Sequence, residues 1–353
     1  MNKCYTYDDV NIIPKFSEIS SRGDVVLDTQ FTKRTKISLP IVSAPMDTIT
    51  ESEMAIGMMS MGGVGVIHRF MNIEQQRREV QRTFDFWETI EPAFDNEDDW
   101  LSVPICAAIG VSGDYLERGQ ELANSGCSVL LIDVAHGHHK NVGEAIEEIK
   151  KNIQGVEVIA GNIATGEGAY YLCEKGADGI RAGIGNGSLC ETRIRTGVGI
   201  PTVSSLLDIT NITDRYGVPV IADGGVRSIG DVCKGLGCKS DSVMLGSLLA
   251  GTKETPGSIE KIGEWPNEQL FKKYRGSASI DSKSDRGEHK NVEGNHKVIP
   301  YKGKLKRIIH DIEDGIRSSF SYVGANNMSE FHSKVDFHIV TNAGIVEAKP
   351  HLL

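Results

Sequence analysis

One cysteine lies in a glycine-rich loop whose composition suits nucleophilic chemistry. Cys190 ends the run Gly183-Ile-Gly-Asn-Gly-Ser-Leu-Cys, and two arginines, Arg193 and Arg195, follow it. Closely spaced glycines adopt positive φ angles and let the main chain approach a ligand or an ion. Neighbouring guanidinium groups favour the thiolate, which is the nucleophilic form of cysteine. The loop therefore predicts Cys190 as a covalent nucleophile.

The other cysteines have a simpler interpretation. A free cysteine is most often a small buried apolar residue, and its residue type alone leaves that alternative open for Cys190 as well. The glycine loop distinguishes Cys190 from the rest, which lie on expected strands or helices or at the N-terminus. We interpret as packing residues Cys4, Cys106, Cys127, Cys173, Cys233 and Cys238.

Two further glycine-bearing segments suit a phosphate group. Asp223-Gly-Gly225 and Gly246-Ser247 each follow an apolar run. Main-chain N–H groups in such turns bind phosphate without a cation, and Asp223 can accept hydrogen bonds from a ribose diol. The two segments together predict a phosphorylated small ligand. A net charge of −10 argues against a general electrostatic grip on nucleic acid.

These residues need elements that bring them together, and the chain has eight apolar runs separated by helical patterns. Strands that are apolar throughout are buried on both faces, as a parallel sheet requires. Eight of them predict a closed (β/α)₈ TIM barrel of the α/β class, with a doubly wound sheet as the alternative. The polar residues fall at the carboxyl ends, where barrel enzymes have their active sites. The runs are 41–46, 63–68, 105–111, 129–136, 156–163, 179–185, 218–226 and 242–251.

The whole chain, residues 1–353, is predicted to form this single catalytic domain. Residues 71–101 are charged and acidic and are expected to be an exposed connection. Residues 276–297 are polar and are either a disordered surface loop or a mobile active-site flap. The chain has no apolar run of 18 residues and no basic segment leading into an apolar one at its start. Its seven cysteines form no C-x-x-C pair. These features predict a cytoplasmic protein without a membrane partner.

Ordered motifs along nearly the whole chain resemble the IMP dehydrogenase/GMP reductase family. This resemblance implies a TIM barrel, usually a homotetramer, that acts on a purine nucleoside 5′-monophosphate with a nicotinamide cofactor. The motifs are Tyr7-Asp-Asp-Val10, Ser43-Ala-Pro-Met-Asp-Thr48, Gly62-Gly-Val-Gly-Val-Ile-His-Arg69, Asp133-Val-Ala-His-Gly-His138, Ala160-Gly-Asn162, the GIGNGSLCETR loop, Ala222-Asp-Gly-Gly225, Val243-Met-Leu-Gly-Ser247 and Tyr274-Arg-Gly-Ser277.

The resemblance also implies residue roles. Cys190 would attack C2 of the purine and form a covalent thioimidate. Asp133, Gly183 and Gly185 would border the nicotinamide ribose. Carbonyl groups of Gly185, Gly187 and Cys190 would bind potassium in those members that use it. The nucleotide would be held by Ser188, Asp223, Gly225, Gly246, Ser247, Tyr274, Gly276 and Ser277.

Three positions depart from the family pattern. Asn186 replaces a usual proline, Glu191 stands where threonine or isoleucine is common, and Arg181 replaces a usual lysine. The first two alter the loop that would hold potassium, so the need for that ion stays open. The paired CBS domains that many IMP dehydrogenases carry after the second strand are not expected, because only the acidic segment 71–101 lies there.

The family's two reactions share the cysteine adduct and then diverge. The dehydrogenase oxidises IMP to XMP with NAD⁺ and activates water through an arginine–tyrosine pair, whereas the reductase converts GMP to IMP and ammonia with NADPH through a threonine–glutamate pair. Arg286 is present, but glycine stands at 287 where that tyrosine would be, and Thr192 and Glu293 match the reductase pair.

The missing tyrosine favours GMP reductase, with IMP dehydrogenase as the alternative. Residues 251–257, the tail 347–351 and the N-terminal half also resemble dehydrogenases. A third hypothesis, an inactive nucleotide-binding relative, is disfavoured because Cys190, Thr192 and Glu293 are all retained.

Overall fold

The computed structural model describes residues 3–90, 104–264, 267–276 and 296–348. Eight parallel strands close into a barrel in chain order, and β11 pairs with β4 to complete it. The predicted TIM barrel is confirmed, and the doubly wound alternative is wrong. The strands are β4 (Ile41–Ser43), β5 (Val64–Ile67), β6 (Cys106–Ile109), β7 (Val129–Asp133), β8 (Glu157–Ile163), β9 (Gly179–Ala182), β10 (Val220–Asp223) and β11 (Ser242–Leu245).

All eight apolar runs contain a barrel strand, and most strands end before the run does. The strand side chains are buried on both faces, as the continuous apolar runs predict. Val64 and Val66 of β5 point into the barrel interior with Leu131 and Met244, while Ile67 packs in the outer layer under the helices. Beyond the strands, the carboxyl-terminal parts of the runs form the loops that carry the polar residues.

A hairpin of β2 (Thr29–Gln30) and β3 (Lys36–Ile37) covers the amino-terminal end of the barrel. Phe31 and Ile37 belong to the same apolar cluster as the inward-facing strand residues. The main-chain N–H of Lys33 bonds to the carbonyl of Asp178, just before β9. The hairpin therefore closes this end of the barrel.

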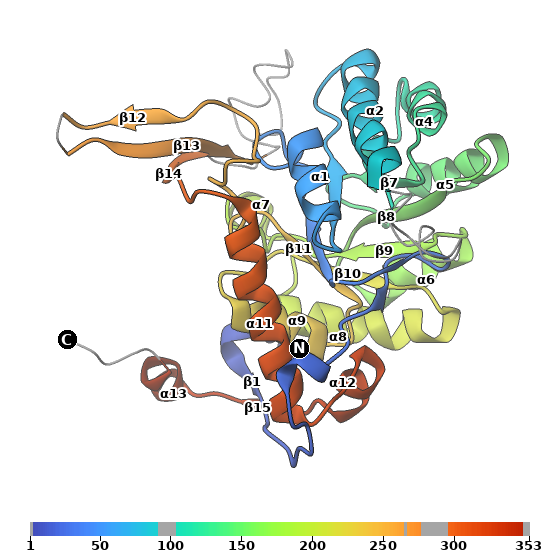
Figure 1. Cartoon of the computed structure of the whole chain (residues 1–353). Helices are drawn as coiled ribbons and strands as arrows, with labels where there is room; N and C mark the ends of the chain where they lie inside the picture. The colour runs from blue at the N-terminus through green and yellow to red at the C-terminus, as the bar shows by residue number, and fades with distance from the viewer. Residues whose placement is uncertain (1–2, 91–103, 265–266, 277–295, 349–353) are drawn as a thin grey trace.

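Helices cover the outside of the barrel (Figure 1). Apolar residues spaced by three or four positions face the strands, as Val142, Ile146 and Ile149 do in α5. The helices of this layer are α1 (Ser52–Met59), α2 (Ile73–Ile90), α4 (Tyr115–Asn124), α5 (Lys140–Asn152), α6 (Gly166–Glu174), α8 (Thr202–Thr213) and α9 (Ile229–Gly237). The short helix α7 (Thr192–Thr196) follows the loop after β9 and buries no residue, and short 3₁₀ turns are η1 (Tyr7–Asp9), η2 (Arg22–Asp24) and η4 (Asp214–Tyr216).

The segment 71–101, expected as a connection, contains helix α2 over most of its length. Its buried residues Gln76, Val80 and Thr83 follow a helical spacing that the many charged residues around them conceal in the sequence. Residues 91–101 lie outside the described residues. Within the part of the chain that the structure describes, no helix has the length and apolarity to span a bilayer.

An antiparallel sheet of β12 (Glu260–Ile262), β13 (Gln269–Arg275) and β14 (His296–Pro300) projects from the barrel (Figure 1). Most of the segment 276–297, the expected flap, lies outside the described residues. Helices α11 (Leu305–Val323), α12 (Met328–Lys334) and α13 (Asn342–Glu347) follow this sheet. Between the last two, β15 (Phe337–Ile339) pairs with β1 (Val10–Ile12) near the start of the chain.

Candidate active site

A cavity of about 410 Å³ opens at the carboxyl ends of the barrel strands. Every predicted site residue that the structure describes lines it, whereas Ser277, Arg286 and Glu293 lie outside the described residues. The barrel therefore brings together residues from five separate segments of the chain. The predicted residues along the wall are Asp133, Gly183, Gly185, Gly187, Ser188, Cys190, Thr192, Asp223, Gly225, Gly246, Ser247, Tyr274 and Gly276.

The cysteine loop connects β9 to α7, and Gly183 and Gly185 stand where a side chain would clash with neighbouring atoms. A Cβ at Gly183 would lie 1.9 Å from the carbonyl oxygen of Asp223, and Gly183 and Gly185 have φ angles of 145° and 80°. Cys190 is half-buried, and its Sγ donates to Thr192 Oγ1 at 3.1 Å. The loop thus presents a thiol with a hydroxyl partner at the cavity wall.

The two arginines after Cys190 form hydrogen bonds with groups other than the thiol. Arg195 Nε donates to Glu191 Oε2 at 2.6 Å, and Arg193 donates to the carbonyl of Ile200 at 2.9 Å. Neither guanidinium hydrogen-bonds to the thiol within the described residues. The expectation that they favour the thiolate stays a prediction; the observed contacts use both side chains to shape the loop and α7.

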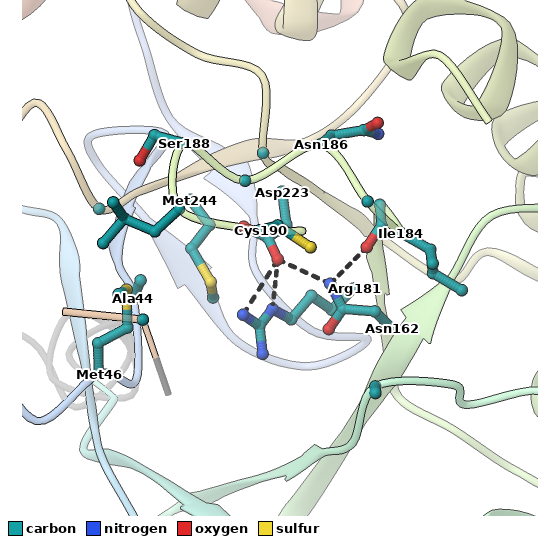
Figure 2. A pocket seen from close by; sticks show the side chains of 18 of the residues that line it. Ala44, Met46, Asn162, Arg181, Ile184, Asn186, Ser188, Cys190, Asp223 and Met244 are labelled. Carbon is teal, nitrogen blue, oxygen red and sulfur yellow. Dashed lines mark hydrogen bonds and ion pairs between the residues drawn. The ribbon is translucent and has the colours of Figure 1, made fainter. Parts of the chain in front are cut away.

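A buried guanidinium joins the two aspartates of the cavity. Arg181 donates through Nη1 to Asp133 Oδ1 at 2.6 Å. Figure 2 shows that it also donates through Nε to Asp223 Oδ2, at 3.0 Å, and that Asn162 donates to the same oxygen, at 2.7 Å. Burial opposes the charge on Arg181, but the two carboxylates raise its pKa overall. The group is therefore a fixed cation between two fixed anions.

Sequence reasoning did not assign Arg181 or Asn162 to the site. Asn162 was visible as a polar residue near the end of a barrel strand, and Arg181 was noted only as a departure from the family pattern. A stronger signal was available, because a charged residue inside an apolar strand run needs a buried partner.

Arg69 and Phe70, after β5, form another part of the wall that the prediction missed. Arg69 Nε lies 3.5 Å from Asp133 Oδ2, and its guanidinium lies over the Phe70 ring at 5.1 Å from the centroid. Among the described residues that line the cavity, Arg69 and Arg181 are the only cations. Apolar side chains complete the wall, including Ala44, Met46, Ile184 and Met244.

A third part of the cavity has neutral hydrogen-bond donors. Ser188 Oγ and Tyr274 Oη lie 2.9 Å apart, and burial raises the pKa of Tyr274, which keeps its phenol protonated. The main-chain N–H groups of Gly225, Gly246 and Ser247 donate to no acceptor among the described residues. Free donors of this kind suit an anion such as phosphate.

The last residues of strand β13 are anchored where the strand reaches the cavity. Arg275 Nη2 lies 2.9 Å from Asp47 Oδ2, and the Arg275 main chain bonds to Thr48 Oγ1. Both partners belong to the loop after β4. These contacts fix the direction of Tyr274, the preceding residue.

The remaining cysteines are placed mostly as predicted. Cys106, Cys127, Cys173, Cys233 and Cys238 are buried, and burial raises the pKa of the Cys127 thiol to about 12. Cys4 is exposed among the described residues, so its interpretation as a packing residue is wrong. Cys190 differs from both groups because it is half-buried at the wall of a cavity.

Comparisons with known proteins agree with this geometry. Residues 4–351 match the model of the IMP dehydrogenase/GMP reductase domain. The chain is 35% identical to inosine-5′-monophosphate dehydrogenase from Cryptosporidium parvum (99% of this chain, 96% of the relative) and 36% identical to that from Borreliella burgdorferi (98% and 96%). A crystal structure of a GMP reductase variant from Trypanosoma brucei in complex with guanosine 5′-monophosphate superposes with a TM-score of 0.91 at 27% identity, covering 100% of this chain and 98% of that one. The chain belongs to the IMP dehydrogenase/GMP reductase family of oxidoreductases.

Proposed function

We propose that this protein is a GMP reductase, which converts GMP to IMP and ammonia with NADPH through a covalent adduct on Cys190. The half-buried thiol on a cavity wall, with a threonine hydroxyl at 3.1 Å, supports the covalent adduct. The glycine at 287, where the dehydrogenase pair would need a tyrosine, favours the reductase. The Cys190 thiolate adds to C2 of the purine, and the bond from C2 to the exocyclic nitrogen breaks as ammonia leaves. A hydride is then added at C2, and the bond to sulfur breaks to release IMP.

The proton for the leaving ammonia is assigned to Thr192 and Glu293. Thr192 Oγ1 accepts the hydrogen bond of the thiol, so the hydroxyl lies beside the atom that will be joined to C2. Glu293 lies outside the described residues, and its role rests on the resemblance to the reductase pair. General acid catalysis of this kind typically contributes a factor of about 10² to 10⁴ in rate.

The nucleotide is assigned to the side of the cavity with neutral donors. Ser188, Gly225, Gly246, Ser247 and Tyr274 would hold its phosphate, and Asp223 would accept hydrogen bonds from the ribose. Gly276 and Ser277 continue this wall beyond β13. In support, Tyr274 Oη and Ser188 Oγ lie within hydrogen-bond distance although 86 residues separate them in the chain.

The nicotinamide cofactor is assigned to the wall that carries Asp133, Gly183 and Gly185. NADPH, when bound, supplies the hydride for C2. Asp133 is held by Arg181 at 2.6 Å, so its carboxylate has a fixed direction in which to accept hydrogen bonds from a ribose. Gly183 and Gly185 have positive φ angles and contribute no side chains to this wall.

The cysteine loop also fits a potassium ion bound by carbonyl groups. The carbonyls of Gly185 and Cys190 accept no hydrogen bond from the described residues, and that of Gly187 accepts one from the Cys190 N–H at 3.1 Å. An ion there would order the loop that carries the thiol. We further propose a cytoplasmic homotetramer, which is the usual assembly of the resembled family.

IMP dehydrogenase is the second candidate. It is favoured by the names of the relatives at 35% and 36% identity, which are inosine-5′-monophosphate dehydrogenases. In that reaction IMP is oxidised to XMP with NAD⁺, and water must be activated to hydrolyse the adduct. Arg286 is present for that step, but residue 287 is a glycine and has no phenol.

Parallel assays of the purified protein separate the two reactions. GMP with NADPH should lower the absorbance at 340 nm and release one ammonia for each NADPH consumed, while IMP with NAD⁺ should give no signal. The variant Glu293→Gln should lose ammonia release. Production of XMP from IMP would support the dehydrogenase, and silence in both assays with retained nucleotide binding would support a binding protein.

A further inference from the structure

A single helical turn after β11 carries two residues of the proposed phosphate site. The N–H groups of Leu249 and Ala250 both bond to the carbonyl of Gly246, at 3.1 and 2.9 Å. The next two carbonyls, those of Ser247 and Leu248, accept hydrogen bonds from an ammonium group instead. That group is Nζ of Lys302, at 3.0 Å from each oxygen. Lys302 lies just beyond β14, and 55 residues separate it from Ser247.

Main-chain bonds fix Lys302 to the same turn. Its N–H donates to the carbonyl of Gly251 at 2.8 Å, and the N–H of Lys253 donates to the carbonyl of Gly303 at 2.7 Å. The chain around Lys302 is therefore docked on the end of the turn, and the ammonium reaches back to its centre. The contact of the Lys302 ammonium is therefore one of several hydrogen bonds between residues 302–303 and the segment that begins with the turn after β11.

Lys302 supplies a positive charge next to a part of the cavity whose described hydrogen-bond donors are all neutral. The two cations on the described wall, Arg69 and Arg181, both face Asp133, and Arg181 also binds Asp223. The donors around Ser188, Gly246 and Tyr274 are neutral. A phosphate dianion there would meet no arginine or lysine of the described wall, and Lys302 is the cation bonded to the turn that carries Gly246 and Ser247.

We infer that Lys302 is a positioning residue for the nucleotide phosphate, acting through the turn Gly246–Ala250. Its ammonium neutralises the carbonyl end of this turn and holds the turn so that Gly246 and Ser247 face the cavity. The side chain touches no ligand itself. This inference rests on the proposed function only in that the ligand is a nucleoside 5′-monophosphate.

Lys302→Met tests the inference when phosphate recognition is measured directly. The dissociation constants of GMP and guanosine are measured at fixed ionic strength. The ratio of the guanosine constant to the GMP constant reports the contribution of the phosphate. Loss of a hydrogen bond from a charged group reaches the phosphate only in part, through the turn, so the ratio should fall about tenfold. Guanosine affinity and kcat should change less than about twofold, as expected for a loss of uniform binding.

Lys304→Met is the matched control. It removes the same charge two residues along, from an exposed side chain that makes no hydrogen bond or ion pair within the described residues. The ratio should stay at the wild-type value in this variant, and Lys302→Arg, which keeps the charge, should restore part of the loss. An unchanged melting temperature of Lys302→Met establishes that the variant is folded.

Three outcomes overturn the inference, and they differ in whether the proposed function survives. A wild-type protein that prefers GMP, together with a Lys302→Met variant that keeps the full preference, removes the role of Lys302 and leaves the proposed function intact. An equal loss in Lys304→Met would show a net-charge effect and likewise remove it. A wild-type protein that binds guanosine as tightly as GMP removes both the phosphate site and the inference.

Discussion

The thiol of Cys190 and the hydroxyl of Thr192 lie 3.1 Å apart at the start of α7. The two residues are close in sequence, but the contact needs the loop to turn just before the helix, which begins at Thr192. The hydroxyl accepts the thiol hydrogen bond and stands beside the atom that would join C2 of the purine. This arrangement gives the first two predictions.

Cys190→Ala should abolish turnover, by more than about 10³-fold, because no other group of the described wall can form the adduct. GMP affinity should stay within about threefold, since the phosphate and ribose contacts are made by other residues. Steady-state kinetics and calorimetric titration measure both quantities. Cys4→Ala, at the exposed cysteine, is the control and should keep full activity; a Cys190→Ala enzyme with most of its kcat would refute the covalent mechanism.

Thr192→Val should lower kcat by about 10²-fold with little change in KM, because it removes the hydroxyl but keeps a β-branched side chain of similar volume. Thr192→Ser should retain most of the activity. Both variants are assayed for NADPH oxidation and ammonia release. If valine is tolerated at this position, the hydroxyl has no part in proton transfer.

Tyr274→Phe should raise the KM for the nucleotide about fivefold, since it removes the phenol that lies 2.9 Å from Ser188 Oγ and a hydrogen bond of this kind contributes about 1 kcal/mol. Ser188→Ala should have a similar effect. The double variant should cost less than the sum of the two, because both substitutions remove the same contact. Full additivity would show that the two hydroxyls act independently.

Arg181→Met should destabilise the protein by about 3 kcal/mol, because it leaves Asp133 and Asp223 without their buried cation. Arg181→Lys should cost less, since it keeps the charge but can reach only one carboxylate well. Urea denaturation measures both. A stable methionine variant would mean that water or a shifted Arg69 compensates the two aspartates.

Asp241→Asn should stabilise the protein at alkaline pH. Burial raises the pKa of Asp241 to about 7 from the ordinary 3.8, and its carboxylate accepts a hydrogen bond from the Val220 N–H. The folded state therefore binds a proton that the unfolded state releases, so this group makes stability fall as pH rises from about 4 to about 7. Asparagine can accept the same hydrogen bond and does not ionise.

The expected gain for Asp241→Asn is about 1–3 kcal/mol at pH 8 relative to pH 4, measured by urea denaturation at both values. Asp178 provides a comparison, because it caps the Val158 N–H in the same way but is paired with Lys150 at 2.7 Å. Its asparagine variant should destabilise the protein at pH 8. Equal behaviour of the two variants would contradict the assignment of the titration to Asp241.

The barrel and the cysteine loop could be predicted from the sequence because their determinants are local. A strand buried on both faces must be apolar throughout, and runs such as 129–133 show this directly. The glycines at 183 and 185 mark a turn that other residues cannot adopt without strain. Helix α2 was missed because charged residues on its exposed face conceal the spacing of the few buried ones.

The partners of individual side chains were decided only by the tertiary structure. The sequence placed Arg193 and Arg195 near the thiol, yet the fold directs them to Ile200 and Glu191. Arg181 meets Asp133 and Asp223, 48 and 42 residues away, only because the closed barrel places β9 beside β10 and one strand away from β7. Periodicity along a chain specifies which residues are buried, but strand order and rotamers determine which buried polar groups meet.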